Sequence, residues 1–221
     1  MSKLEIIKTG EWSSPFAQVL EQAFLSAEQT DSKLSDFVTN MSGMSGRKYR
    51  VLINRLIEKM PDARYLEIGS WRGSTACSAI DGNTVKALCI DSWNEGNDIR
   101  TDFLNNTQRV KNSNSIIDSI KSDFADIDYT SIGKYNVYMF DGPHEKQDQY
   151  NGIAFALPAL DDTYILIVDD YNASQVQEGT EEALAMLNQT VVASIKILSH
   201  ENPYLRRSDW HNGYFIAVIK K

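Results

Sequence analysis

The stretch YLEIGSWRG, residues 65–73, decides the fold class of this chain. A short apolar run, typical of a buried strand, leads into a turn with Gly69 and Gly73 and then into a helical pattern. Such turns bind nucleotides, because glycine lets the backbone approach a ligand and the following helix offers free N–H groups. A pyrophosphate-binding loop has a further glycine, and here the side chains of residues 70–72 fill that room. We therefore expect a nucleoside ligand with a small zwitterionic tail rather than a dinucleotide.

Strand and helix patterns alternate on both sides of this turn. Apolar strand patterns cover 64–69, 85–91, 115–122, 135–141 and 164–170, with helical patterns at 74–80, 101–110, 124–131 and 149–160 between them. Two further helices are expected before them, at 14–30 and 47–60. The last two strands, 191–198 and 213–221, have no helix between them, which indicates an antiparallel pair that closes one edge.

The pattern as a whole predicts an α/β fold of Rossmann-like type. We expect a mostly parallel seven-stranded sheet with a C-terminal antiparallel hairpin and helices on both faces. Residues 1–40 are interpreted as an N-terminal helical extension and residues 41–221 as the α/β domain. The extension is expected to form part of an acceptor pocket or the face of a homodimer, and these alternatives stay open.

Composition narrows the classes of partner. The formal net charge of −8 argues against binding to nucleic acid or to an anionic membrane, because phosphate groups are repelled on average. No apolar run approaches the ~20 residues of a membrane span, and the N-terminus lacks the apolar core of a secretory signal. Cys77 and Cys89 are interpreted as buried free thiols of a cytoplasmic protein.

Acidic residues follow the predicted strands at the edge where such sheets bind ligands. Asp91 ends the strand after the glycine turn, 18 residues beyond Gly73, where a carboxylate can accept hydrogen bonds from both hydroxyls of a ribose. The alternative is that the glycines only form a tight turn and that Asp91 caps a helix. The register of Asp91 within the strand–helix–strand unit favours the ligand.

These residues carry a resemblance to a known family. LEIGSWRGSTACSAI, residues 66–80, resembles motif I of class I S-adenosylmethionine-dependent methyltransferases, in the style of catechol O-methyltransferase. MSGMSGRKYRVLINRLIEK, residues 41–59, is similar to the segment that closes over the cofactor in that group, and FDGPHEKQDQY, residues 140–150, to a metal-site motif. LIVDDYN, residues 166–172, is most similar to macrocin-type sugar O-methyltransferases.

The resemblance implies a cofactor site for S-adenosyl-L-methionine. Glu67 and Gly69 would approach the methionine end, and Asp91 would hold the ribose. The residues that the resemblance places around the cofactor are Met44, Ser45, Glu67, Gly69, Ser70, Trp71, Gly73, Ser74, Asp91, Ser122, Asp123 and Asp141. For Asp123 a role as N-cap of the helical pattern that follows stays equally open.

Three aspartates are expected to converge beyond the sheet edge. Asp141 ends one strand and Asp169 and Asp170 end another, and neighbouring strand ends lie ~5 Å apart. Three carboxylates this close need a cation, and oxygen ligands suit Mg²⁺ first, or Ca²⁺ or Mn²⁺. The resembling enzymes bind a divalent ion at these positions. The alternative is that one aspartate caps a helix and another pairs with a basic side chain.

His144, three residues after Asp141, is the expected general base, against an alternative of packing on a helix start. The catechol-type enzymes carry lysine at the matching position, and Lys146 is a second candidate for the base. His200 and His211 flank the last loop and could reach a substrate. Arg206, Arg207 and Trp210 in that loop could bind an anionic or sugar-like acceptor, or form only a surface loop.

The sequence thus predicts a metal-dependent O-methyltransferase that acts on a small hydroxylated acceptor such as a sugar, a catechol or a natural product. One rival is a nicotinamide-dependent oxidoreductase, which the short glycine turn and the lack of a well-placed Tyr-x-x-x-Lys pair disfavour. The other is a cofactor-binding module without catalysis, which the three retained aspartates disfavour.

Overall fold

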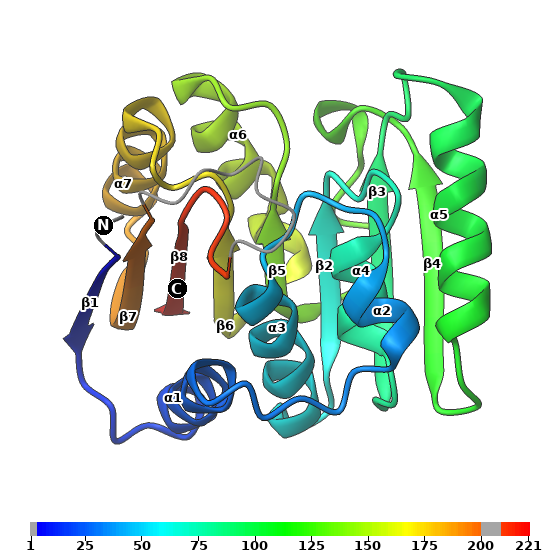
Figure 1. Ribbon diagram of the computed structural model, residues 1–221. Helices are drawn as coiled ribbons and strands as arrows, with labels where there is room; N and C mark the ends of the chain where they lie inside the picture. Colours follow the sequence, from blue (N-terminus) through cyan, green and yellow to red (C-terminus); the bar gives the residue numbers. More distant parts are fainter. Residues whose placement is uncertain (1–3, 200–208) are drawn as a thin grey trace.

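One twisted sheet carries the whole arrangement. The structure, a computed structural model, describes residues 4–199 and 209–221. Within these residues eight strands are ordered β1-β7-β8-β6-β5-β2-β3-β4, and Figure 1 shows them from β1 at one edge to β4 at the other. The strands are β1 (Glu5–Gly10), β2 (Arg64–Ile68), β3 (Val85–Asp91), β4 (Ser115–Lys121), β5 (Tyr135–Phe140), β6 (Leu160–Val168), β7 (Thr190–Leu198) and β8 (Tyr214–Lys220).

The predicted Rossmann-like arrangement is confirmed. β2 to β6 pair in parallel, and β8 lies between β6 and β7, antiparallel to both. Two expectations are wrong, since the hairpin does not close the edge and residues 1–40 are not purely helical. Both errors arise from β1, which pairs antiparallel with β7 and forms an eighth, outermost strand. Glu5 pairs with Leu198, so the partner that makes this segment a strand lies far away in the sequence.

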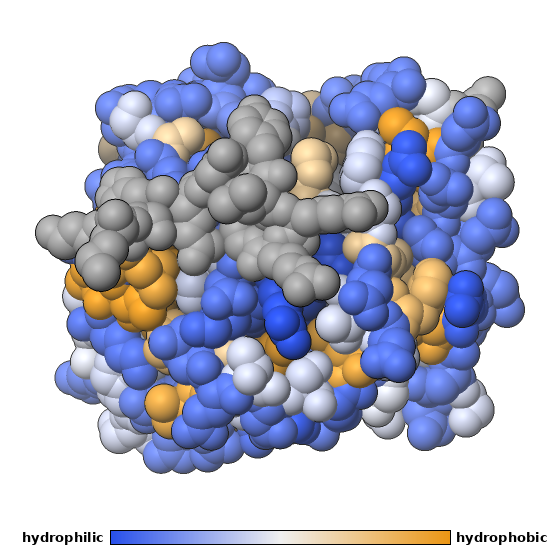
Figure 2. Space-filling view, viewed as in Figure 1, coloured by the Kyte–Doolittle hydropathy of each residue, from blue (hydrophilic) through white to orange (hydrophobic). Residues whose placement is uncertain are grey.

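Helices cover both faces of the sheet. Those described are α1 (Pro15–Glu28), α2 (Asp36–Asn40), α3 (Arg47–Lys59), α4 (Ser74–Ile80), α5 (Asn97–Val110), α6 (Lys146–Ala156) and α7 (Ser174–Met186), with short 3₁₀ helices η1 (Phe124–Asp126) and η2 (Leu157–Ala159). α1, α3 and α4 bury their apolar sides on one face, and α6 and α7 on the other. The outer surface over α1 and α3 is mostly hydrophilic, apart from a hydrophobic patch at the edge where β1 lies (Figure 2).

The local patterns fix most helix positions. Ser14 caps α1 by accepting a hydrogen bond from the Ala17 N–H, and Pro15 occupies the first turn, as the sequence predicts. The segment 124–131, predicted to be helical, forms only η1. Helix α7 is not predicted from the sequence, because its row of buried residues is narrow and includes Gly179. Cys77 and Cys89 are buried and free, as predicted. Among the described residues, no helix has both the length and the apolar character of a membrane span.

Candidate active site

A cavity of about 330 Å³ opens at the carboxyl ends of the four strands β2, β3, β4 and β5. This is the edge where open α/β sheets bind ligands, and the volume falls in the range of small-molecule sites, ~300–1,000 Å³. Eight of the predicted site residues line it, namely Met44, Gly69, Trp71, Asp91, Ser122, Asp123, Asp141 and His144. The candidate active site therefore lies where the sequence places it.

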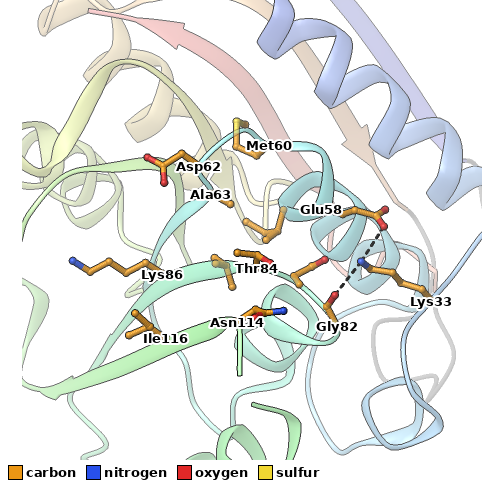
Figure 3. A pocket seen from close by; sticks show the side chains of 13 residues that line it. Lys33, Glu58, Met60, Asp62, Ala63, Gly82, Thr84, Lys86, Asn114 and Ile116 are labelled. Carbon is orange, nitrogen blue, oxygen red and sulfur yellow. Dashed lines mark hydrogen bonds and ion pairs between the residues drawn. The ribbon is translucent and has the colours of Figure 1, made fainter. Parts of the chain in front are cut away.

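A larger cavity of about 480 Å³ lies at the opposite edge, where β2, β3 and β4 begin (Figure 3). There the Lys33 ammonium donates to the Glu58 carboxylate at 2.9 Å and to the Gly82 carbonyl at 3.4 Å. Apolar Met60 and Ile116 also line this cavity, and Ile116 lies on its far side near Lys86. None of the predicted site residues lines this cavity, so it has no part in the proposed chemistry.

The backbone conformation and the close neighbours of Gly69 and Gly73 leave no room for a larger residue at either position. Gly69 has φ +83°, and a Cβ added there would lie 1.8 Å from the carbonyl oxygen of Asp141. Gly73 also has φ +83°, caps α4, and a Cβ there would lie 2.9 Å from the Phe103 ring. Only glycine adopts this backbone conformation without strain. The turn therefore passes against the end of β5 and brings the two halves of the site together.

Asp91 joins two loops at the cavity. Its Oδ2 accepts the Trp71 N–H at 2.8 Å, and its Oδ1 accepts the Trp93 N–H at 2.7 Å. Both tryptophans have left-handed backbones, with φ of 44° and 43°, a conformation that is costly away from glycine and often occurs at functional sites. Each carboxylate oxygen keeps a lone pair for a ligand hydroxyl. Trp93 was not predicted, although its position two residues after Asp91 could have indicated it.

Glu67 is a fully buried acid with an incomplete set of partners. Its Oε2 accepts the Tyr65 hydroxyl at 2.5 Å, whereas its Oε1 has no hydrogen-bond partner among the described residues. Burial raises the pKa of the Glu67 carboxyl to about 7, even though the hydroxyls of Tyr65 and, close by, of Ser70 and Thr75 favour the ionised form. A buried carboxylate oxygen without a partner suits a cationic ligand group such as an ammonium.

The remaining predicted cofactor residues lie nearby. The Ser45 and Ser74 hydroxyls form a hydrogen bond of 2.9 Å, and the Ser70 Oγ is buried without a partner among the described residues. Asp123 accepts the Ala125 N–H at 2.9 Å and thereby caps η1, while it also lines the cavity. The Ser122 N–H donates to the Asp91 carbonyl. The structure thus confirms the capping contact of Asp123 without excluding a ligand contact.

At the other end of the cavity, Asp141, His144 and Asp170 each offer a ligand atom within 4.8 Å of the others. The His144 Nε2 lies 2.9 Å from the Asp170 Oδ2 and 3.6 Å from the Asp141 Oδ1. Asp169 is not in this group, because it is buried and its Oδ1 accepts the Asp170 N–H at 2.7 Å. The structure therefore brings together two of the three predicted aspartates, with His144 in the third place.

The pKa values of the acidic groups at this corner shift in different directions. Burial raises the pKa of Asp141 to about 6, and burial and the charges of Asp141 and Asp170 raise the pKa of Asp169 well above its usual value. Although burial opposes it, hydrogen bonds from His144 and Asn212 lower the pKa of Asp170. Hydrogen bonds to Asp141 and Asp170 raise the pKa of His144 to about 10, so His144 is an imidazolium at neutral pH.

Asp170 is held from outside the predicted motifs. It has a left-handed backbone with φ 54°, and the Asn212 Nδ2 donates to its Oδ1 at 2.7 Å. Asn172 fixes the same corner, because its side chain bonds both the Ser199 carbonyl and the Ser199 N–H. Sequence reasoning missed Asn212, whose partner is 42 residues away.

Other predicted contacts are placed elsewhere. Trp210 is wrong as an acceptor contact, since it is fully buried and stacks on Phe24 with ring centroids 5.9 Å apart. Lys146 is exposed and pairs with Glu182 at 2.7 Å. The His211 Nδ1 is buried without a hydrogen-bond partner among the described residues, and burial lowers the pKa of His211. The predictions for His200, Arg206 and Arg207 lie outside the described residues.

Comparison with known proteins agrees with this geometry. Residues 66–171, just under half of the chain, match the model of a family described as a methyltransferase domain. No curated protein matches the chain by sequence. The matched segment begins at β2 and ends just beyond Asp170, so it contains Glu67, Asp91 and the Asp141 cluster.

Solved structures share the fold at low sequence identity. A candidate caffeoyl-CoA O-methyltransferase from Staphylococcus aureus is 15% identical, with a TM-score of 0.56, and the match covers 91% of this chain and 92% of that one. An O-methyltransferase from Bacillus cereus in complex with S-adenosylhomocysteine is 13% identical, with a TM-score of 0.54 and coverage of 92% and 91%. A candidate RNA methyltransferase from Pyrococcus horikoshii is 11% identical, with a TM-score of 0.57 and coverage of 92% and 98%.

The chain spans about half the length of three other matching structures, between 48% and 51%. Identities this low establish the fold alone. The chain therefore shares the fold of these methyltransferases, and the segment that matches the methyltransferase domain contains the residues of the candidate site.

Proposed function

We propose that this protein transfers the methyl group of S-adenosylmethionine to the hydroxyl of a small acceptor, with a divalent cation bound beside the cofactor. The observation that carries the proposal is one cavity lined by a nucleoside-type site and by Asp141 and His144, two members of a carboxylate–histidine cluster. The catechol-type and macrocin-type resemblance of the motifs supports O-methylation, and the O-methyltransferases among the similar folds agree with it.

The residues present fit the cofactor. The Asp91 carboxylate is held open to the cavity by two backbone N–H groups, and its remaining lone pairs suit the two hydroxyls of a ribose. The partnerless Oε1 of Glu67 suits the ammonium of the methionine end. Gly69 lines the cavity and packs directly against the Asp141 carbonyl. Asp91 would thus hold the ribose and Glu67 the methionine end of a cofactor that would supply the methyl group.

The donor set also fits a divalent cation. The two carboxylates, from neighbouring strands, suit Mg²⁺ or Mn²⁺, and the imidazole is a ligand for softer ions than Mg²⁺. Asn212 orients Asp170 as an outer partner. A bound ion would supply Lewis-acid chemistry and lower the pKa of the acceptor hydroxyl. Asp169 supports this set from beneath through the Asp170 N–H rather than as a ligand.

In the methyl-transfer step the protein has only to align the two reactants and provide for the acceptor proton. The acceptor oxygen bonds to the methyl carbon, the carbon–sulfur bond breaks, and its electron pair stays on the sulfur of S-adenosylhomocysteine. The acceptor proton needs a base, and His144, which is an imidazolium at neutral pH, cannot receive it while both carboxylates are ionised beside it. His144 can therefore act as the base only when a cation neutralises Asp141 and Asp170 without binding the imidazole, because a nitrogen that binds the ion has no lone pair left for the acceptor proton. The remaining role of the chain is alignment.

The test is transfer of labelled methyl from S-adenosylmethionine to a panel of catechols, glycosides and bulk RNA, with Mg²⁺ or with EDTA. We expect Mg²⁺-dependent labelling of a small hydroxylated compound and none of RNA. Asp170→Asn is the control that should remove the Mg²⁺-dependent labelling. Labelling that persists in EDTA refutes the metal, and labelling of RNA alone refutes the small acceptor.

A further inference from the structure

A short segment between α2 and α3, residues 41–46, passes beside the cavity. We call this segment the strap. Met44 lines the cavity and is 59% exposed, so its position depends chiefly on the strap backbone. A wall made by a side chain so open to solvent depends on how firmly the strap is fixed.

Arg50, in the second turn of α3, fixes the strap at both ends. Its Nε donates to the Ser45 Oγ at 2.9 Å. Its Nη1 donates to the carbonyl oxygens of Met41 at 3.0 Å and of Val38, in α2, at 2.9 Å. One planar guanidinium thus binds the start of the strap, its end and the helix before it, which an ammonium with a single nitrogen cannot reach together.

Burial of the Arg50 charge is unfavourable for the stability of the fold. Arg50 is only 5% exposed and has no carboxylate partner among residues 4–199 and 209–221, so its charge rests on carbonyl and hydroxyl oxygens. Burial lowers the pKa of Arg50 accordingly. An unpaired buried charge is less favourable than a well-packed apolar side chain of similar size. Its place behind the strap is better explained by the residues that it positions.

The strap is also seated on α4, the helix that follows the glycine turn. The Ser45 hydroxyl that Arg50 binds forms its second hydrogen bond with the Ser74 hydroxyl, at 2.9 Å. Gly43 approaches so closely that an added Cβ would lie 2.3 Å from the Ser74 Cβ. Arg50 therefore acts through Ser45 on the contact between the strap and the turn that receives the cofactor.

We propose that Arg50 is a positioning residue for cofactor binding, which locks the strap onto α4 so that Met44 forms one wall of the cavity. The proposal rests on the proposed function, since it takes S-adenosylmethionine as the ligand of this cavity. Arg50 touches neither the cluster at the end of β5 nor the cavity itself, so its effect is on affinity and not on the chemical step.

The experiment is calorimetric titration of S-adenosylhomocysteine into the full chain and into Arg50→Gln, Ser45→Ala and the double variant. Arg50→Gln should lower affinity about tenfold or more and Ser45→Ala about threefold, and the double variant should be no weaker than Arg50→Gln alone. The kcat at saturating cofactor should stay within about threefold of the parent. Arg55→Gln is the matched control, because Arg55 lies on the same helix but pairs with exposed Asp31 and Glu58.

Affinity of Arg50→Gln within about twofold of the parent overturns the proposal, as does a fall in kcat with unchanged affinity. Additive losses in the double variant also overturn it, because Arg50 would then not act through Ser45. Should Arg50→Gln fail to fold, Ser45→Ala decides alone, and affinity within about twofold of the parent is the contrary result. A parent that binds no S-adenosylhomocysteine refutes the proposed function instead.

Discussion

The Nε2 of His144 lies 2.9 Å from the Oδ2 of Asp170, and His144 lines the cavity. The pair joins the loop after β5 to the corner after β6. In the structure the imidazolium is the counter-charge of this corner, so a divalent cation must take over that role when it binds. The geometry therefore separates Asp170, which faces His144, from Asp169, which faces the protein interior.

This separation predicts different effects for the two neighbouring aspartates. Asp170→Asn should weaken Mn²⁺ binding about tenfold or more, because it removes a charged ligand. Asp169→Asn should leave Mn²⁺ affinity within about threefold, because the amide can still accept the Asp170 N–H. Mn²⁺ titration followed by electron paramagnetic resonance measures both. Loss of binding in Asp169→Asn with retention in Asp170→Asn would reverse the assignment.

The raised pKa of Glu67 predicts that the protein loses stability as the pH rises, and that Glu67→Gln does not. Its pKa is about 7 in the folded protein against an ordinary value of 4.5, so the native state holds this proton longer than the unfolded state. Stability is therefore lost as pH rises from about 4.5 through 7. Glu67→Gln removes that loss, and its advantage over the parent should grow by about 2 kcal/mol between pH 5.5 and 8.5.

Urea unfolding of Glu67→Gln and the parent at the two pH values measures this difference. Glu67→Gln should also bind S-adenosylhomocysteine about tenfold more weakly at pH 8.5, since the ammonium loses a charged partner. An advantage that stays constant with pH would show that Glu67 is ionised to the same extent in both states.

The close approach at Gly69 predicts a specific cost. Gly69→Ala brings a Cβ to 1.8 Å from the Asp141 carbonyl, so the turn or the end of β5 must move. Gly82→Ala is a matched control, because Gly82 also has a positive φ, +65°, but has nothing within 4 Å of the added Cβ. The control should cost about 1–2 kcal/mol and Gly69→Ala at least about 2 kcal/mol more. Equal losses in chemical denaturation would mean that the contact carries no weight.

Asp91 and Asp123 both line the cavity, but we expect Asp91 to contact the ligand and Asp123 to act mainly as the cap of η1. Asp91→Ala should lower affinity for S-adenosylhomocysteine about thirtyfold or more, because it removes the ribose partner and frees the Trp71 and Trp93 loops. Asp123→Ala should cost about 1 kcal/mol of stability through loss of the η1 cap, with affinity within about threefold. Calorimetric titration measures the affinity and thermal unfolding the stability, and a large loss of affinity in Asp123→Ala would show that Asp123 also contacts the cofactor.

Sequence reasoning reached features that local pattern encodes. The strand that ends at Gly69, the helix that starts after Gly73 and the acids at strand ends follow from hydrophobic period and glycine chemistry. The parallel sheet then places Asp91 and Asp141 at one edge without knowledge of distant contacts.

Features that depend on distant partners were missed. β1 is a strand only because β7 offers its edge, and Asn212 reaches Asp170 only after the final hairpin folds back. Side chains alternate between the two faces of a strand, but this alternation no longer holds after the strand has ended. The sequence therefore could not tell that Asp170 lies beside His144 while Asp169 is buried. Trp210 was misread because an aromatic residue in a loop has the same pattern whether it faces a substrate or, as here, packs on Phe24.

The central claim is that the cavity at the carboxyl ends of β2 to β5 binds the cofactor S-adenosylmethionine. Calorimetric titration of the protein with S-adenosylhomocysteine tests it most directly, with Asp91→Ala as the control for the site. We predict saturable binding of one ligand per chain with Kd of about 1–100 μM in the parent, and a severe loss of affinity in Asp91→Ala. The absence of binding heat at millimolar ligand, or equal affinity in Asp91→Ala and the parent, would contradict the claim.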